Sequence, residues 1–234
     1  MDADHVDVLS RTLTRPLSRR DSLGGLAMGG MLALGPVLEQ RTGLARKGKG
    51  KKRKFKTVTR TFTNSAPITI PVPDPTDPYP SLIEVNGFLD GKILDVNLTL
   101  HRITHSDPAD LDVLLAAAHL PGLNALVMRA AGDENGNAAD LTLTLDDQAA
   151  QPLPKDPVAL SSGTFRPTRA EAQDAVAPPA PPLSGRSDLA VFNNADPNGT
   201  WQLFVDDGND SGVIAGGWSL QITAKVRKKR KKKR

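Results

Sequence analysis

Two runs of alternating apolar and polar residues near the C-terminal end constrain the fold of this chain most. Large apolar side chains occupy every second position of both runs: Trp201, Leu203 and Val205, then Trp218, Leu220 and Ile222. Alternation with a period of two, bounded by Asn, Asp and Gly, is typical of half-buried strands. We therefore expect residues 194–223 to form two strands joined by an acidic loop, with Trp201 and Trp218 as core anchors.

Similar alternation recurs through the middle of the chain and predicts an all-β protein. It is clearest at residues 57–62, 94–100 and 141–145. The 20 glycines and 19 prolines among the 234 residues favour turns over long helices. About nine or ten short strands with regularly spaced turns predict an antiparallel β-sandwich. The proline-rich residues 152–182 are expected to follow the surface of this sandwich as a connection.

The basic charge is concentrated in two segments that flank an acidic domain. Residues 46–56 contain eight Lys and Arg, and residues 225–234 contain nine. Residues 57–224 contain 8 basic and 21 acidic residues, a net charge of −13. Dense runs of one charge cannot bury apolar surface, so we predict disordered basic arms at 46–56 and 225–234 around a folded domain at 57–224.

The two arms are the predicted polyanion-binding segments. Their candidate residues are Lys51, Lys52, Arg53 and Lys54, then Lys228, Lys229, Arg230, Lys231, Lys232 and Lys233. Three targets compete: anionic lipid head groups, with peripheral membrane contact; anionic polymers of the cell envelope; and nucleic acid. The C-terminal arm lacks aromatic residues, which disfavours base stacking. The alternative is that both arms are solvated tails.

Residues 1–45 have the pattern of a leader. Arg19 and Arg20 precede an uncharged apolar run of 16 residues. This run is shorter than the ~20 residues that span a bilayer. The segment from Ser18 to Leu23 resembles a twin-arginine export signal, which implies export to the cell envelope or the extracellular space. The alternatives are a helix buried in the domain and an uncleaved signal that acts as an anchor.

Several segments, in order, resemble one known family. They include LDVNLTLHRITHSDPADLDVLL, NGNAADLTLTLDDQA, SSGTFRP and DPNGTWQLFVDDGNDSGVIAGGWSLQIT. Residues of about 64–223 resemble the P domain, or P/Homo B domain, which follows the catalytic domain of subtilisin-like proprotein convertases and many bacterial proteases. The resemblance implies a jelly-roll-like β-sandwich, closed by the hairpin at 194–223. The first and last strands of a jelly roll often lie close together, so the two basic arms are expected to act from one side.

The resemblance does not extend to a protease catalytic domain. A subtilisin-type site needs Asp, His and Ser in one geometry. The chain has no GTSMA-like serine motif, and Ser161, Ser162 and Ser211 have turn-like contexts. His105 lies at the position of a histidine found in the family, and the resemblance implies that its role is structural. We therefore expect a chain that is not an enzyme.

Acidic residues are the candidate metal ligands. Asp110 and Asp112 precede one predicted strand, and Asp206, Asp207 and Asp210 share one glycine-containing loop. Calcium is bound by six to eight oxygen ligands, which such loops supply. Some bacterial P domains bind calcium, so the resemblance favours calcium as the cofactor. The alternative is that these are solubilising turn residues, since Asp, Asn and Gly dominate turns in general.

These features support three functional hypotheses. The first is an exported, non-catalytic binding module, held at the cell envelope by its basic arms, with a protein partner or a surface ligand. The second is an accessory subunit of a separately encoded serine protease. The third is a cytoplasmic protein that binds nucleic acid through the arms, and export would make this hypothesis untenable.

Overall fold

The computed structural model describes residues 53–72, 75–169, 176–207 and 210–229 of the chain. These residues form strands and two 3₁₀-helices, η1 (Pro108–Asp110) and η2 (Leu189–Phe192). The strands are β1 (Phe55–Asn64), β2 (Ile68–Ile70), β3 (Ser81–Val85), β4 (Lys92–His105), β5 (Asp112–Ala117), β6 (Asn124–Arg129), β7 (Ala138–Leu145), β8 (Gly163–Phe165), β9 (Thr168–Arg169), β10 (Gly199–Asp206), β11 (Gly212–Ile214) and β12 (Trp218–Arg227).

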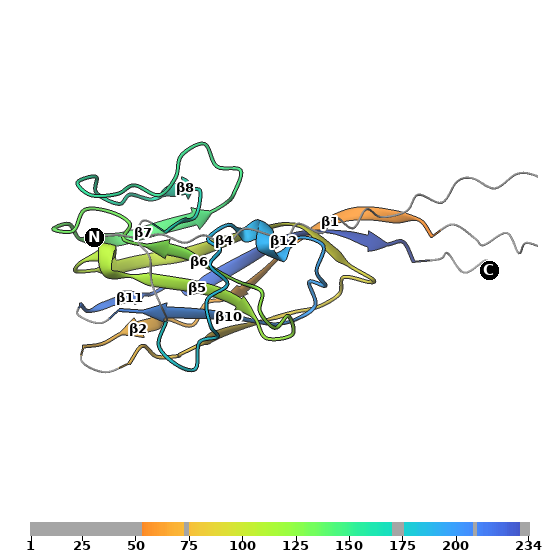
Figure 1. Ribbon diagram of the computed structural model, residues 1–234, viewed down its shortest axis with the longest axis horizontal. Helices are drawn as coiled ribbons and strands as arrows, with labels where there is room; N and C mark the ends of the chain where they lie inside the picture. Colours follow the sequence, from red (N-terminus) through yellow and green to blue (C-terminus); the bar gives the residue numbers. More distant parts are fainter. Residues whose placement is uncertain (1–52, 73–74, 170–175, 208–209, 230–234) are drawn as a thin grey trace, which may run out of the picture. The chain divides into compact units, whose positions relative to one another are not determined.

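The strands form two sheets that pack face to face. One sheet has seven strands in the order β1-β12-β4-β11-β2, with β7 and β8 added beyond β4, and the other has five in the order β3-β10-β5-β6-β9 (Figure 1). Nested antiparallel pairs, β1 with β12, β3 with β10, β4 with β7 and β5 with β6, define a jelly roll. The predicted all-β, antiparallel jelly-roll-like β-sandwich is confirmed.

The core lies between the two sheets and contains both tryptophans. Trp201 of β10 and Trp218 of β12 are fully buried in one apolar cluster. Each indole N–H is paired: Trp201 donates to the Pro197 carbonyl over 3.0 Å, and Trp218 donates to Ser81 Oγ over 2.9 Å. Both residues therefore anchor the core, as the alternation of their strands predicts.

The stretch expected to form a closing hairpin is divided between the two sheets. β10 pairs with β3 and β5, whereas β12 pairs with β1 and β4. The prediction that these two strands pair as a hairpin is therefore wrong. Both strands bury one apolar face in the same core, but from opposite sides, so their patterns look alike. The acidic residues between them belong to the crossover from one sheet to the other.

The proline-rich segment covers the outer face of the five-stranded sheet. Val176 packs with Leu114, Leu126 and Phe204 in a second apolar cluster. Asn124 of β6 fixes the far end of this cover, because its amide donates to the Pro182 carbonyl over 3.0 Å. Residues 176–182 thus follow the surface, as expected, whereas residues 152–169 contribute β8, β9 and the buried Leu153 and Leu160 to the sandwich. Phe165 instead belongs to β8, which pairs with β7.

The folded domain extends beyond the predicted bounds of 57–224. β1 begins at Phe55 and β12 ends at Arg227, and these two residues are partners in the ladder. Lys56, Lys225 and Arg227 are therefore strand residues and not parts of the arms. Apolar residues at alternate positions of β12, such as the buried Val226, extend the strand into the basic sequence.

Candidate functional site

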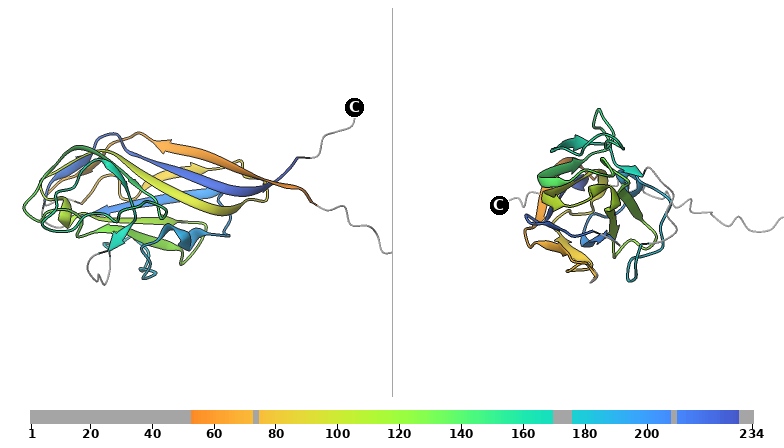
Figure 2. Two further views of the ribbon diagram at one scale, coloured as in Figure 1. Left: turned by 90° about the horizontal axis from the view of Figure 1, so that it is seen from above. Right: turned by 90° about the vertical axis from the view of Figure 1, so that its left-hand side faces the viewer.

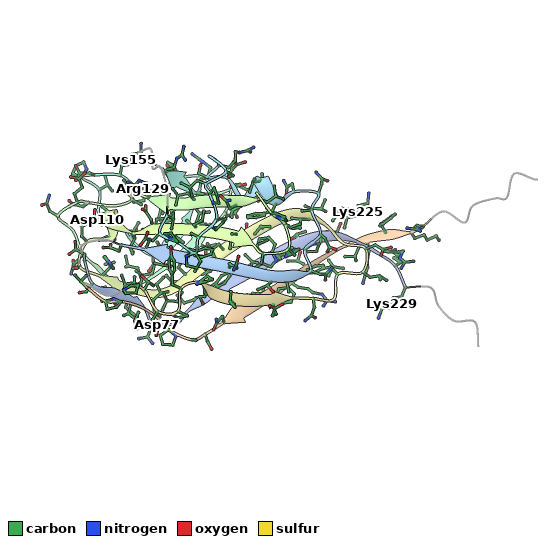
Figure 3. The ribbon with its side chains drawn as sticks, turned by 60° about the horizontal axis from the view of Figure 1, so that its bottom comes forward. Asp77, Asp110, Arg129, Lys155, Lys225 and Lys229 are labelled. Carbon is green, nitrogen blue, oxygen red and sulfur yellow. The ribbon has the colours of Figure 1, made fainter. Side chains whose placement is uncertain are left out.

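The two ends of β4 carry opposite charge, and we describe them as a basic end and an acidic end. The basic end comprises Arg53, Lys54, Lys56, Lys92, Lys225, Arg227, Lys228 and Lys229, around the start of β1 and the end of β12. The acidic end comprises residues 105–112, 206–207 and 210–212. Figure 3 shows Lys225 and Lys229 at one end of the sandwich and Asp110 at the other.

The basic end exists because the first and last strands pair along their whole length. The ladder runs from Phe55 opposite Arg227 to Asn64 opposite Trp218. It continues outward, because the N–H of Lys228 donates to the carbonyl of Lys54 over 2.9 Å. Figures 1 and 2 show the two strands side by side. The two basic segments of the sequence therefore join the domain at neighbouring positions.

The structure describes only some of the predicted basic residues. Arg53, Lys54, Lys228 and Lys229 lie at the basic end. Lys51, Lys52, Arg230, Lys231, Lys232 and Lys233, and the export-signal residues Arg19 and Arg20, lie outside the described residues. The structure adds Lys92, which faces Lys225 across β4 and β12 and which the sequence pattern did not single out.

One carboxylate balances part of this charge. Asp90 lies 2.7 Å from Arg227 Nε and 3.9 Å from Arg53 Nη1. It precedes β4, in the turn whose Leu89 carbonyl accepts the N–H of Arg227 over 2.9 Å. The remaining lysines of the basic end leave it strongly positive.

The acidic end brings together two of the five predicted metal ligands and one residue that was missed. Carboxylate oxygens of Asp107, Asp110 and Asp210 lie within 4.8 Å of one another. Burial raises the pKa of Asp107, and repulsion from Asp110 and Asp210 raises it further. Asp107 also caps η1 by accepting the N–H of Ala109 over 3.0 Å. Asp107 was missed because only the folded loops reveal this grouping.

The other three predicted ligands have different partners. Asp112 of β5 accepts a hydrogen bond from Arg129 of β6. Asp206 accepts the N–H of Ala177 over 3.0 Å, which ties the proline-rich cover to the end of β10. Among the described residues, neither Asp112 nor Asp206 belongs to the group formed by Asp107, Asp110 and Asp210.

The Asp207 side chain is fully buried beside His105. Its Oδ2 lies 3.4 Å from His105 Nε2, and its Oδ1 accepts the N–H of Asp210 over 2.8 Å. His105 Nδ1 lies 2.8 Å from the Asp107 carbonyl oxygen. Gly212 closes over the ring, since a Cβ there would lie 2.0 Å from His105 Cδ2. His105 and Asp207 therefore join the two acidic loops in the interior.

A serine and a histidine do meet elsewhere, on the seven-stranded sheet. His101 Nε2 lies 2.7 Å from Ser219 Oγ, and Ser219 is buried. Among the described residues, no carboxylate is hydrogen-bonded to His101, and no hydrogen bond joins Ser161, Ser162 or Ser211 to a histidine side chain. A buried hydroxyl on a strand with no orienting acid lacks the geometry of a serine triad.

Comparisons with known protein families, with curated proteins and with solved structures found no match to this chain. In the described part of the chain, neither short helix has the length and apolar character needed to cross a membrane.

Proposed function

We propose that this protein is an exported, non-catalytic binding module of the P/Homo B type, held at an anionic surface of the cell envelope by its basic end. The observation that carries this proposal is the pairing of β1 with β12. It brings Arg53 and Lys54, which precede Phe55, close to Lys228 and Lys229, which follow Arg227. Two segments that leave one point of a domain bind one surface together.

The charges at this point favour a multivalent electrostatic contact. Each Lys or Arg close to an anionic surface contributes about 1 kcal/mol, and salt screens the attraction. Once one segment is bound, its neighbour meets the surface at a high effective concentration. The attraction therefore grows with the number of basic residues, although no single residue dominates it.

The opposite polarity of the two ends favours one orientation of the domain. β4 has 14 residues between them. At ~3.3 Å per residue, they are roughly 40 Å apart. An anionic surface attracts the basic end and repels Asp107, Asp110 and Asp210. The acidic loops then point away from the surface and remain accessible to a protein partner.

The jelly-roll strand order supports the resemblance to the P domain, because that family implies this fold. Fold alone does not define function. A P-domain module recognises or stabilises other proteins, and this chain is proposed to act in the same way. Peptidase activity of the purified full chain that a serine-directed inhibitor abolishes would contradict the non-catalytic part of the proposal.

The test of surface attachment compares two charge-neutralising variants. The full chain is mixed with vesicles that contain acidic phospholipid, and separately with immobilised polyphosphate, at increasing NaCl concentration. Neutralising Lys228 and Lys229 with Gln is expected to weaken binding severalfold and to reduce its salt dependence. The control neutralises Arg102 and Lys155, which are exposed away from the basic end, and is expected to bind normally. Equal effects of both variants would contradict a localised site.

Export is tested by cell fractionation. The chain with Arg19 and Arg20 is expected in the envelope or the medium, and the R19K/R20K double variant in the cytoplasm. Recovery of both chains at full length in the cytoplasm would overturn the export part of the proposal.

A further inference from the structure

Exposed apolar side chains are concentrated at the basic end. Among the described residues, the large apolar side chains with high exposure are Phe55, Val72, Leu82, Leu89, Leu94 and Val158. Half of them, Phe55, Leu89 and Leu94, surround the end of β12. Phe55 is the ladder partner of Arg227, and the Leu89 carbonyl accepts the N–H of Arg227. Leu94 lies two residues after Lys92, the partner of Lys225.

Phe55 projects from the outer face of the seven-stranded sheet. The inner face is fixed by Ala224 and Ile93, which are partners and fully buried. Their neighbours Lys225 and Lys92 therefore point outward. Thr57 is the ladder partner of Lys225 and therefore also points outward. Phe55 lies two residues before Thr57 in β1, so its side chain points to the same outer face. The Lys225 ammonium group is 5.3 Å from the centroid of the Phe55 ring.

Leu94 is exposed beside these residues because the ladder is irregular there. The pairing of β4 with β12 shifts register between Thr223 and Ala224, so Leu94 has no partner in that ladder. Phe55 is 43% exposed and Leu94 is 44% exposed. Large apolar side chains at such exposure, with Lys92 and Lys225 beside them, form a surface that is both apolar and cationic, although the Asp95 carboxylate follows Leu94.

This combination distinguishes between anionic targets. A soluble polyphosphate or a nucleic acid backbone is recognised by charge and offers no apolar phase. The interface of an acidic bilayer offers both, because lysine ammonium groups remain among the head groups while apolar side chains reach the acyl boundary. Asp90 is paired with Arg227 and Arg53 and adds little repulsion.

We infer that the basic end docks on a bilayer rich in acidic phospholipid, with Phe55 and Leu94 inserted into its interfacial region. This inference rests on the proposed attachment to an anionic surface and identifies that surface as lipid. The lysines of β12 and β4 hold the domain at the head groups, and the two apolar side chains anchor it more deeply.

A tryptophan scan of the full chain tests the insertion. The native Trp201 and Trp218 are fully buried and provide a constant background. F55W places a reporter at the basic end. The matched control is L82W, because Leu82 is 47% exposed and lies beside Asn64, at the other end of β1. With vesicles of half acidic and half zwitterionic lipid, F55W is expected to shift its emission to the blue and to be quenched by bromine-labelled acyl chains. L82W is expected to show neither effect.

A second pair of variants measures the contribution of insertion to affinity. F55S/L94S is expected to bind these vesicles about tenfold more weakly, because less apolar surface leaves water. Its binding to polyphosphate is expected to stay unchanged. The control L82S is expected to match the parent in both assays.

The outcomes separate this inference from the proposed function. Vesicle binding without quenching of F55W, or with quenching of L82W instead, overturns the insertion but leaves attachment to an anionic surface intact. Binding to polyphosphate but not to vesicles also overturns the lipid inference alone. Binding to duplex DNA only, or to none of these probes, overturns both.

Discussion

Trp218 of β12 donates its indole N–H to the hydroxyl of Ser81 in β3, which links the two sheets across the core over 2.9 Å. The Asn64 amide donates to the same hydroxyl over 3.2 Å, and Ser81 is almost completely buried. One serine oxygen therefore serves two donors from the opposite sheet.

Replacing Ser81 with Ala is expected to reduce the free energy of unfolding by about 1–3 kcal/mol, because the buried indole N–H of Trp218 loses its acceptor. Urea denaturation of the full chain measures the change. The control S161A removes an exposed hydroxyl and is expected to alter stability by less than about 0.5 kcal/mol. Equal midpoints for both variants would show that this bond does not contribute.

A second prediction concerns the pair formed by Arg129 and Asp112. The Asp112 side chain is nearly buried, and Arg129 is its cation in the neighbouring strand. R129M removes this cation from the carboxylate and is expected to lower the free energy of unfolding by about 3 kcal/mol or more. R186M is the matched control, since Arg186 pairs with Asp188 at an exposed site. Its expected cost is much smaller than that of R129M, because solvent screens an exposed ion pair. A similar loss in both variants would contradict a special role for burial.

A third prediction concerns the pH dependence of stability. Burial raises the pKa of Asp95 above its ordinary value of 3.8, and repulsion from Asp146 raises it further. At pH values between the pKa of Asp95 in the unfolded chain and its higher pKa in the folded chain, the folded chain binds more protons than the unfolded chain. The contribution of Asp95 to the free energy of unfolding therefore falls as pH rises through this window. D95N is expected to be more stable than the parent at pH 7, by less than about 1 kcal/mol because solvent screens the site.

The control for Asp95 has the opposite sign. The hydrogen bond from Arg186 lowers the pKa of Asp188, so Asp188 stabilises the folded chain above its ordinary pKa and loses this effect as pH falls. D188N is therefore expected to be less stable than the parent at pH 7. Urea denaturation at several pH values measures both effects. A D95N variant that is less stable at pH 7 would refute the assigned cause.

The strands could be predicted from sequence because period-two alternation records which face of each strand is buried. The assignment of β10 and β12 to different sheets could not, because both strands present the same apolar pattern to one shared core. The jelly-roll order came from the resemblance of ordered segments, and the paired ends of β1 and β12 follow from it.

The groupings of charged residues were harder to predict, because they arise only when distant loops meet. Asp107 and Asp210 are far apart in sequence, whereas adjacent Asp206 and Asp207 face different partners. Sequence proximity therefore did not predict which carboxylates lie close together. The sequence pattern did not indicate Lys92 for the same reason, since its ladder partner Lys225 lies on another strand.

A fourth prediction concerns the proline-rich cover of the five-stranded sheet. The Tyr79 hydroxyl donates to the Ala177 carbonyl over 2.6 Å, and its ring packs edge-on against Phe204. Y79F keeps the ring but removes the bond, at an expected cost of about 1 kcal/mol. Limited proteolysis is expected to cut the variant faster within residues 176–184. T164A, which alters an exposed residue of β8, is the control. Identical cutting rates would exclude Tyr79 as an anchor of the cover.

The fifth prediction is the calcium dependence that the sequence predicts for the acidic loops. A cation among Asp107, Asp110 and Asp210 would relieve the repulsion between their carboxylates. A ligand that binds only the folded chain raises its melting temperature. The full chain is therefore expected to melt at a higher temperature in millimolar calcium than in chelator. D210N is expected to lose most of this difference, whereas D156N, in a separate loop, is expected to keep it. Identical melting temperatures in calcium and in chelator would contradict calcium binding at the acidic end. The three carboxylates would then act only as a repulsive group facing away from the anionic surface.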